Sequence, residues 1–147
     1  MTTGIMPLQS CNGSSADRQG NSSRFVRRSR EAVRECETVV AVMGINKSIE
    51  REGQDRYDIQ LPADQREFLQ EIYKVNPNII VVLVAGSSLA INWMDEHIPA
   101  IVNAWYPGEQ GGTAVAEVLF GDYNPAGRLP LTYYKSLDEL LRLMIMI

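Results

Sequence analysis

The run "NIIVVLVAG", residues 78–86, is the strongest indication of fold class in this chain. It is a continuous apolar segment of strand length, it is rich in β-branched residues, and it ends at a glycine. A strand of this composition has both of its faces covered, which is typical of a parallel sheet that lies between layers of helices. We therefore expect a buried central strand here, with partner strands in the neighbouring sequence.

Similar segments lie on both sides of this run. "TVVAVMG", residues 38–44, and "IPAIVNAWY", residues 98–106, also have the length and composition of strands. Segments with helical spacing or composition separate and follow the three strands, at residues 62–77, 91–96 and 108–121. This alternation predicts an α/β fold, a three-layer sandwich around a mostly parallel sheet.

The two ends of the chain differ from this pattern. Residues 1–30 are rich in Ser, Gly, Asn and Arg without apolar periodicity, which predicts a disordered tail. Residues 137–147 form an atypical apolar tail, so the predicted domain covers residues 31–136. We expect the sheet of this domain to be incomplete, with an exposed edge and an exposed apolar face that favour association.

The composition excludes several classes of function. The 147 residues are 45% hydrophobic and 22% charged, as in an ordinary soluble domain, and the net charge of -4 argues against a general nucleic-acid binder. No apolar run reaches the roughly 18 residues that span a bilayer. The first residues have neither a basic start nor an apolar stretch, so we expect no secretory signal here. Two cysteines and a single histidine, His97, provide no metal-ligand spacing. We expect no metal, no cofactor and no membrane partner. The sequence does not indicate the compartment.

The most polar part of the chain directly follows a predicted strand. In "INKSIEREGQDRYDIQLP", residues 45–62, most positions from Glu50 to Asp58 are charged. Functional loops of parallel sheets lie at the carboxyl ends of strands. This loop should therefore lie on one rim with residues 86–92 and 106–112.

Carboxylates are the most credible chemistry of this loop. In an extended segment Glu50 and Glu52 would share one face, and one of them could serve as a general acid. Arg56 could pair with Asp55 or Asp58 and stiffen the loop. A loop that is charged only because it is solvated is the alternative.

Two other motifs favour structural roles. "PGEQGG", residues 107–112, precedes a helix and could face an anion, but close packing of helix on strand explains its glycines equally well. It has no Lys-Ser/Thr after the glycines, so it is not a phosphate loop. His97 has no nucleophile-elbow serine as a partner, and we interpret it as structural.

Taken together, these motifs resemble a known family. The segments "EREGQDR", "LPADQ", "NPNIIVVLVAG", "AWYPGEQGG" and "VLFGDYNPAGRLPLTYYKS" occur in the order and spacing found in the C-terminal α/β-sandwich domain of glycoside hydrolase family 3, the β-glucosidases and β-xylosidases. The resemblance covers about residues 37–136. It implies hydrolysis, with retention of configuration, of terminal β-linked glucosyl or xylosyl residues.

The resemblance also implies roles for particular residues. In the family, an Asp of a separate N-terminal (β/α)₈ barrel is the nucleophile, and a Glu from a loop of the second domain commonly serves as acid/base. Glu52, in "EGQDR", is the first candidate for this proton donor and Glu50 is the second. Asp55 and Arg56 would hold the loop or face the sugar.

The family pattern implies that this chain lacks part of the machinery. Retaining hydrolysis needs two carboxyl groups about 5 to 5.5 Å apart, and the residues that match the family include no barrel nucleophile. We therefore expect a fragment that is inactive alone and whose partners are the barrel domain and a β-linked oligosaccharide or glycoside. The alternatives are a non-catalytic carbohydrate-binding or interaction remnant and, less favoured, an RNA-binding module through the arginines of residues 18–34.

Overall fold

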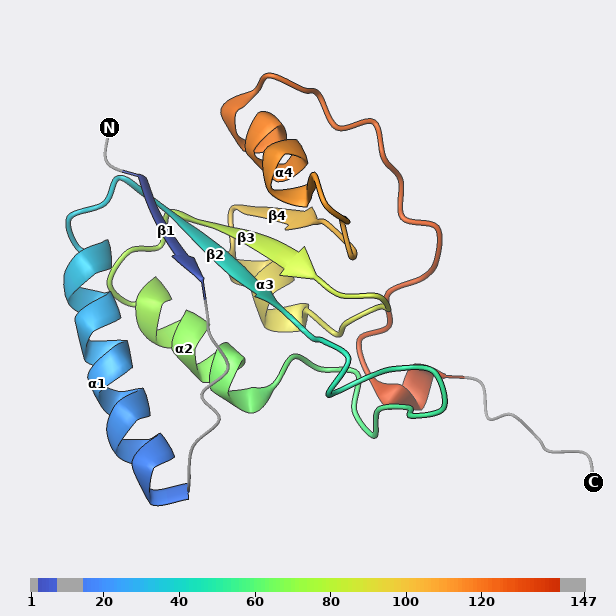
Figure 1. Cartoon of the computed structure of the whole chain (residues 1–147), viewed down its shortest axis with the longest axis horizontal. Helices are drawn as coiled ribbons and strands as arrows, with labels where there is room; N and C mark the ends of the chain where they lie inside the picture. Colours follow the sequence, from blue (N-terminus) through green and yellow to red (C-terminus); the bar gives the residue numbers. More distant parts are fainter. Residues whose placement is uncertain (1–2, 8–14, 141–147) are drawn as a thin grey trace, which may run out of the picture.

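The computed structural model describes residues 3–7 and 15–140, and it confirms the predicted α/β class. Four parallel strands form one sheet in the order β1-β2-β3-β4 (Figure 1). The strands are β1 (Thr3–Pro7), β2 (Thr38–Gly44), β3 (Ile79–Val84) and β4 (Ala100–Asn103). The helices are α1 (Ser15–Val33), α2 (Ala63–Tyr73), α3 (Asn92–His97) and α4 (Gly111–Phe120), followed by the short 3₁₀ helix η1 (Leu137–Glu139).

The two central strands hold the core. β2 and β3 pair from Val39 opposite Ile79 to Gly44 opposite Val84. Ile79 and Val81 are completely buried, as the β-branched composition of β3 predicts. Because side chains alternate along a strand, the odd-numbered residues of β2 and β3 face one layer of helices and the even-numbered residues face the other side.

The layer formed by α1, α2 and α3 is well packed. Val33, Leu69 and Met94, one residue from each helix, belong to the same buried cluster as the odd-numbered residues of β2 and β3. These three helices connect neighbouring strands of a sheet whose order follows the chain. Since such connections are right-handed, all three helices fall on one face of the sheet.

The opposite layer contains α4 and is less complete. In Figure 1 α4 lies beside β4, across the sheet from α1 and α2. Its apolar residues Val115, Val118 and Leu119 are only half-buried, and Phe120 at its end is 70% exposed. The three-layer sandwich is therefore incomplete, as predicted, with β1 and β4 as unpaired edges within the described residues.

The N-terminal segment differs from the sequence-based prediction. Where the composition of residues 1–30 predicts disorder, the structure has β1 and most of α1. A few apolar residues hold α1 against the domain, because Val26 and Val33 pack on the core. Phe25 also stacks on Phe68 of α2, with ring centroids 5.3 Å apart, and Ser29 is buried. Arg24, Arg27, Arg28 and Arg30 lie at exposed or half-exposed positions of this helix. They are the solvated face of a packed helix rather than a tail.

The segment after α4 crosses back over the domain. Tyr133 accepts a hydrogen bond from Asn103 of β4 at 2.8 Å, and the backbone of Lys135 accepts one from Asn92 of α3 at 3.0 Å. Burial raises the pKa of Tyr133, and the bond from Asn103 lowers it by a smaller amount. Of the predicted apolar tail, residues 137–140 are described and include η1, whereas residues 141–147 lie outside the described part of the chain.

Gly44 is the point at which the chain leaves the sheet, and it provides a test of the central pairing. A Cβ atom at this position would overlap the carbonyl oxygen of Val84 on β3. We expect Gly44→Ala to lower the free energy of unfolding by about 1 to 3 kcal/mol, because β2 has to move away from β3. Urea unfolding followed by circular dichroism measures this change.

Gly112 of α4 is the matched control. A Cβ atom there meets no other atom within 4 Å. Gly112→Ala should leave the stability unchanged or raise it by up to about 1 kcal/mol, because Ala is the better helix former. Equal unfolding midpoints for Gly44→Ala and the wild type would contradict the close approach of β2 and β3.

Candidate active-site loop

Three loops meet at the carboxyl edge of the sheet, as predicted. They follow β2, β3 and β4, and side chains connect them. Arg56 of the first loop donates to Ser87 of the second, and Tyr106 of the third donates to the backbone oxygen of Ile45 in the first, at 3.3 Å. We call the first of these, residues 45–61, the carboxylate loop.

Both ends of the carboxylate loop are fixed to the domain. At its start the side chain of Gln65 on α2 accepts a hydrogen bond from the N–H of Gly44 at 2.9 Å and donates one to the Gly44 oxygen at 2.8 Å. At its end the N–H of Ala90 donates to the oxygen of Ile59 at 2.8 Å, and Leu61 is buried. The motif "LPADQ" thus supplies the side chain that anchors the loop.

An ion pair organises the middle of the loop. The Nε atom of Arg56 pairs with Oε2 of Glu50, and its Nη2 atom donates to Ser87 Oγ at 2.8 Å and to the Ser88 oxygen at 2.9 Å. Ser87 in turn donates to Glu50 Oε2 at 2.7 Å. The side chain of Arg56 is only 9% exposed and that of Glu50 is 24% exposed. Glu50 therefore neutralises a nearly buried guanidinium and is held by two partners.

Glu52 has a different environment. It lies in a tight turn, in which Arg51 and Gln54 exchange backbone hydrogen bonds of 3.2 and 2.9 Å. Gly53 takes the position with φ 74°, which strongly favours glycine. Glu52 is exposed, and its carboxylate makes no hydrogen bond or ion pair with the other described residues. The turn presents this carboxylate outward, without a partner among the described residues.

The structure corrects two details of the sequence-based interpretation. Glu50 and Glu52 do not share one face of an extended segment, because Glu50 ends the turn that begins at Asn46, and the next turn carries Glu52. Arg56 pairs with Glu50 rather than with Asp55 or Asp58. Asp55 is exposed, and Asp58 accepts a hydrogen bond from the N–H of Gln60 at 3.0 Å.

Sequence reasoning missed Ser87 as part of this arrangement. The motif "AGSS", residues 85–88, lacks the nucleophile-elbow pattern, and the sequence indicates no other role for its serines. In the structure the Ser87 hydroxyl accepts from Arg56 and donates to Glu50, so it joins the second loop to the first. The available signal was its position three residues after the end of the buried strand β3.

The other motifs have structural environments. Gly111, in "PGEQGG", is buried, and a Cβ atom there would lie 2.5 Å from Cγ of Pro107. His97 stacks on Trp93 with ring centroids 4.7 Å apart. In the described part of the chain no group of three or more His, Cys, Asp or Glu side chains is arranged to hold a metal ion. None of the helices that the structure describes is long and apolar enough to cross a membrane.

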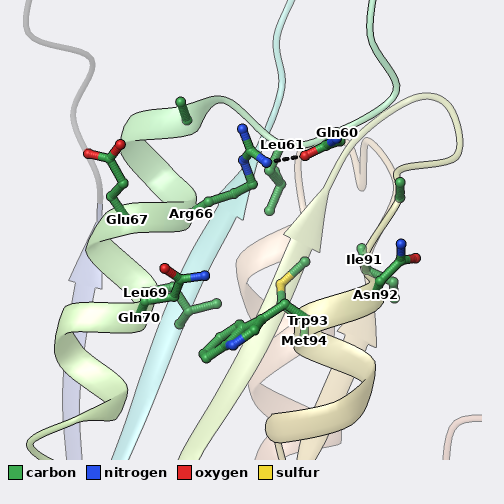
Figure 2. A pocket seen from close by; sticks show the side chains of 12 residues that line it. Gln60, Leu61, Arg66, Glu67, Leu69, Gln70, Ile91, Asn92, Trp93 and Met94 are labelled. Atoms are coloured by element: carbon green, nitrogen blue, oxygen red, sulfur yellow. Dashed lines mark hydrogen bonds between the residues drawn. The ribbon is translucent and has the colours of Figure 1, made fainter. Parts of the chain in front are cut away.

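A groove of about 380 Å³ lies between α2 and α3. Figure 2 shows Arg66 of α2 hydrogen-bonded to Gln60 at its edge, with Trp93 and Met94 of α3 facing Leu69. Its lining includes neither Glu50 nor Glu52, and of the carboxylate loop only Gln60 and Leu61 contribute. The groove is therefore separate from the candidate catalytic carboxylates.

The fold and the rim define an α/β domain that presents a carboxylate-bearing loop at the carboxyl ends of its strands. Residues 6–144 match the model of the glycosyl hydrolase family 3 C-terminal domain, so the chain belongs to this family.

Similar proteins have consistent names. A xylan 1,4-beta-xylosidase of Xylanibacter ruminicola is 44% identical, over 71% of this chain and 14% of the relative. A beta-glucosidase of Rhizobium radiobacter is 38% identical, over 74% of this chain and 13% of the relative. The solved beta-glucosidase of Kluyveromyces marxianus in complex with glucose matches with a TM-score of 0.75 and 34% identity, over 79% of this chain and 14% of that one. The chain thus spans a small part of the length of these relatives.

The different environments of Glu50 and Glu52 predict different effects on stability. Glu50→Gln leaves the nearly buried Arg56 without its counter-charge and should lower the free energy of unfolding by about 1 to 3 kcal/mol. Glu52→Gln removes an exposed, unpartnered charge and should change it by less than about 0.5 kcal/mol. Urea unfolding of the two variants under the same conditions compares them. Equal losses would show that Glu50 does not carry the ion pair described here.

Proposed function

We propose that this domain supplies the acid/base loop of a retaining β-glycosidase that hydrolyses terminal β-linked glucosyl or xylosyl residues. Glu52 is the proton donor, and the nucleophile comes from an N-terminal (β/α)₈ barrel. The observation that carries the proposal is the outward presentation of Glu52 on a turn whose base is anchored to the sheet. The family membership and the names of the similar proteins support this reaction class.

The chemistry of the loop favours Glu52 over Glu50. A general acid must approach the glycosidic oxygen and release its proton there. Glu50 is held by Arg56 and Ser87, and protonating it would leave a nearly buried guanidinium without its counter-charge. Glu52 makes no comparable hydrogen bond or ion pair with the other described residues. Glu50 and Arg56 therefore act as loop support, and the exposed Asp55 is available to face the sugar or the barrel.

Transplantation into a complete relative tests this proposal. The corresponding segment of the Xylanibacter ruminicola xylosidase is replaced by residues 38–136 of this chain, and hydrolysis of aryl β-xylosides and β-glucosides is measured. We expect an active chimera in which Glu52→Gln lowers kcat/KM about 10² to 10⁴-fold for a poor leaving group such as phenol. With 2,4-dinitrophenol, which leaves without a proton, the loss should be much smaller.

Glu50→Gln in the same chimera is the matched control. It changes the support of the loop rather than the proton donor, so its loss of activity should be similar for both leaving groups. A leaving-group dependence that appears with Glu50→Gln and not with Glu52→Gln would transfer the acid/base role to Glu50. An active chimera that keeps its full activity in both variants would contradict the proposal and favour a non-catalytic role of this loop.

A further inference from the structure

The backbone of the third loop is strained at Trp105. Its φ of 54° is the only positive φ of a non-glycine residue in the described part of the chain. For a bulky side chain this conformation is strained and persists only where surrounding contacts hold it. Trp105 follows directly on the last ladder bond of the sheet, from the N–H of Ala104 to the oxygen of Leu83 at 2.8 Å. The strain therefore lies at the point where β4 enters the rim.

The residue that follows, Tyr106, contacts both other loops. Its ring lies so close to Gly86 of the second loop that a Cβ atom there would be 2.5 Å from Cε2 and 3.0 Å from Cδ2. Its hydroxyl donates to the backbone oxygen of Ile45, the first residue of the carboxylate loop, at 3.3 Å. Tyr106 is nevertheless 49% exposed, so removal of its ring from water is not the main contribution of these contacts to stability.

The contact with Gly86 continues to the carboxylates. Gly86 precedes Ser87, which donates to Glu50 and accepts from Arg56. The second loop thus lies between the Tyr106 ring on one side and the ion pair on the other. Because Gly86 precedes Ser87 in the chain, we expect a displacement of Gly86 to shift the hydroxyl that holds Glu50, two residues before Glu52.

We infer that Tyr106 is a positioning residue that locks the three rim loops together and thereby holds the Glu52 turn in place. The strained conformation of Trp105 directs Tyr106 toward Gly86 and Ile45, and glycine at position 86 leaves the space for its ring. The inference rests on the proposed function for the importance of Glu52. Its test measures order in the loop and needs no hydrolysis, so the two can fail separately.

The test uses the 147-residue chain labelled with ¹⁵N. Backbone order parameters are measured for Arg51 and Gln54, whose hydrogen bonds close the Glu52 turn, and hydrogen exchange is measured for the buried amide of Ile45. In Tyr106→Ala and Gly86→Ala we expect the order parameters of the turn to fall from about 0.85 toward 0.6. The ratio of the exchange rate in the variant to that in the wild type should be at least about tenfold larger at Ile45 than at Val81 in β3.

Two further variants separate this role from a general loss of stability. Tyr106→Phe keeps the ring and removes only the hydroxyl, so it should fold normally, accelerate exchange at Ile45 and change the turn less than Tyr106→Ala. Tyr123→Ala removes another exposed tyrosine, distant in sequence from the rim, and should leave both measurements unchanged. Unchanged order parameters in Gly86→Ala together with unchanged Ile45 exchange in Tyr106→Phe would overturn the inference. So would a parallel acceleration at Ile45 and Val81, because it would reflect global unfolding alone.

Discussion

The parallel pairing of β2 with β3 is the constraint on which the rest of this domain depends. Parallel neighbours place their carboxyl ends at the same edge, so the loops after Gly44 and Val84 must start side by side. Glu50 and Ser87 are 37 positions apart in the chain, and this pairing is what brings their side chains within hydrogen-bond distance. The parallel direction of the strands therefore determines which loops are neighbours in the candidate site. The hydrogen bonds of the polar residues then determine how these loops are positioned relative to one another.

The buried charge at the rim gives this arrangement its specificity. A guanidinium that is only 9% exposed is costly unless it is neutralised and hydrogen-bonded. Glu50, the Ser87 hydroxyl and the Ser88 carbonyl together satisfy most of this requirement, although the Nη1 atom of Arg56 is buried without a partner among the described residues. Alternative conformations of the loop would separate these groups and leave charge unpaired. The ion pair thus selects one loop conformation more than it adds to the overall stability.

The sequence predicted the fold better than it predicted the site. The apolar runs at residues 38–44 and 78–86 are strong local signals, and β2 and β3 lie within them. Most of helix α1 lies in the segment for which the composition predicts disorder. It is stabilised by a few long-range contacts, such as Phe25 on Phe68, that produce no local periodicity in the sequence. The partner of Arg56 was missed for a related reason. Local spacing suggested Asp55 or Asp58, whereas the folded loop brings Glu50 to it.

The contrast between the two glutamates follows from these constraints. Gly53 closes the turn that carries Glu52 and needs no side-chain support, so Glu52 is left free of structural partners within the described domain. Two residues earlier, Glu50 is bound to Arg56 and Ser87, and its loss would disturb the loop that aims the turn. A single loop thus carries one carboxylate that is bound into its structure and a second that is exposed and unpaired among the described residues. Their spacing in the sequence does not distinguish these two acidic residues, whereas the folded loop places them in different environments.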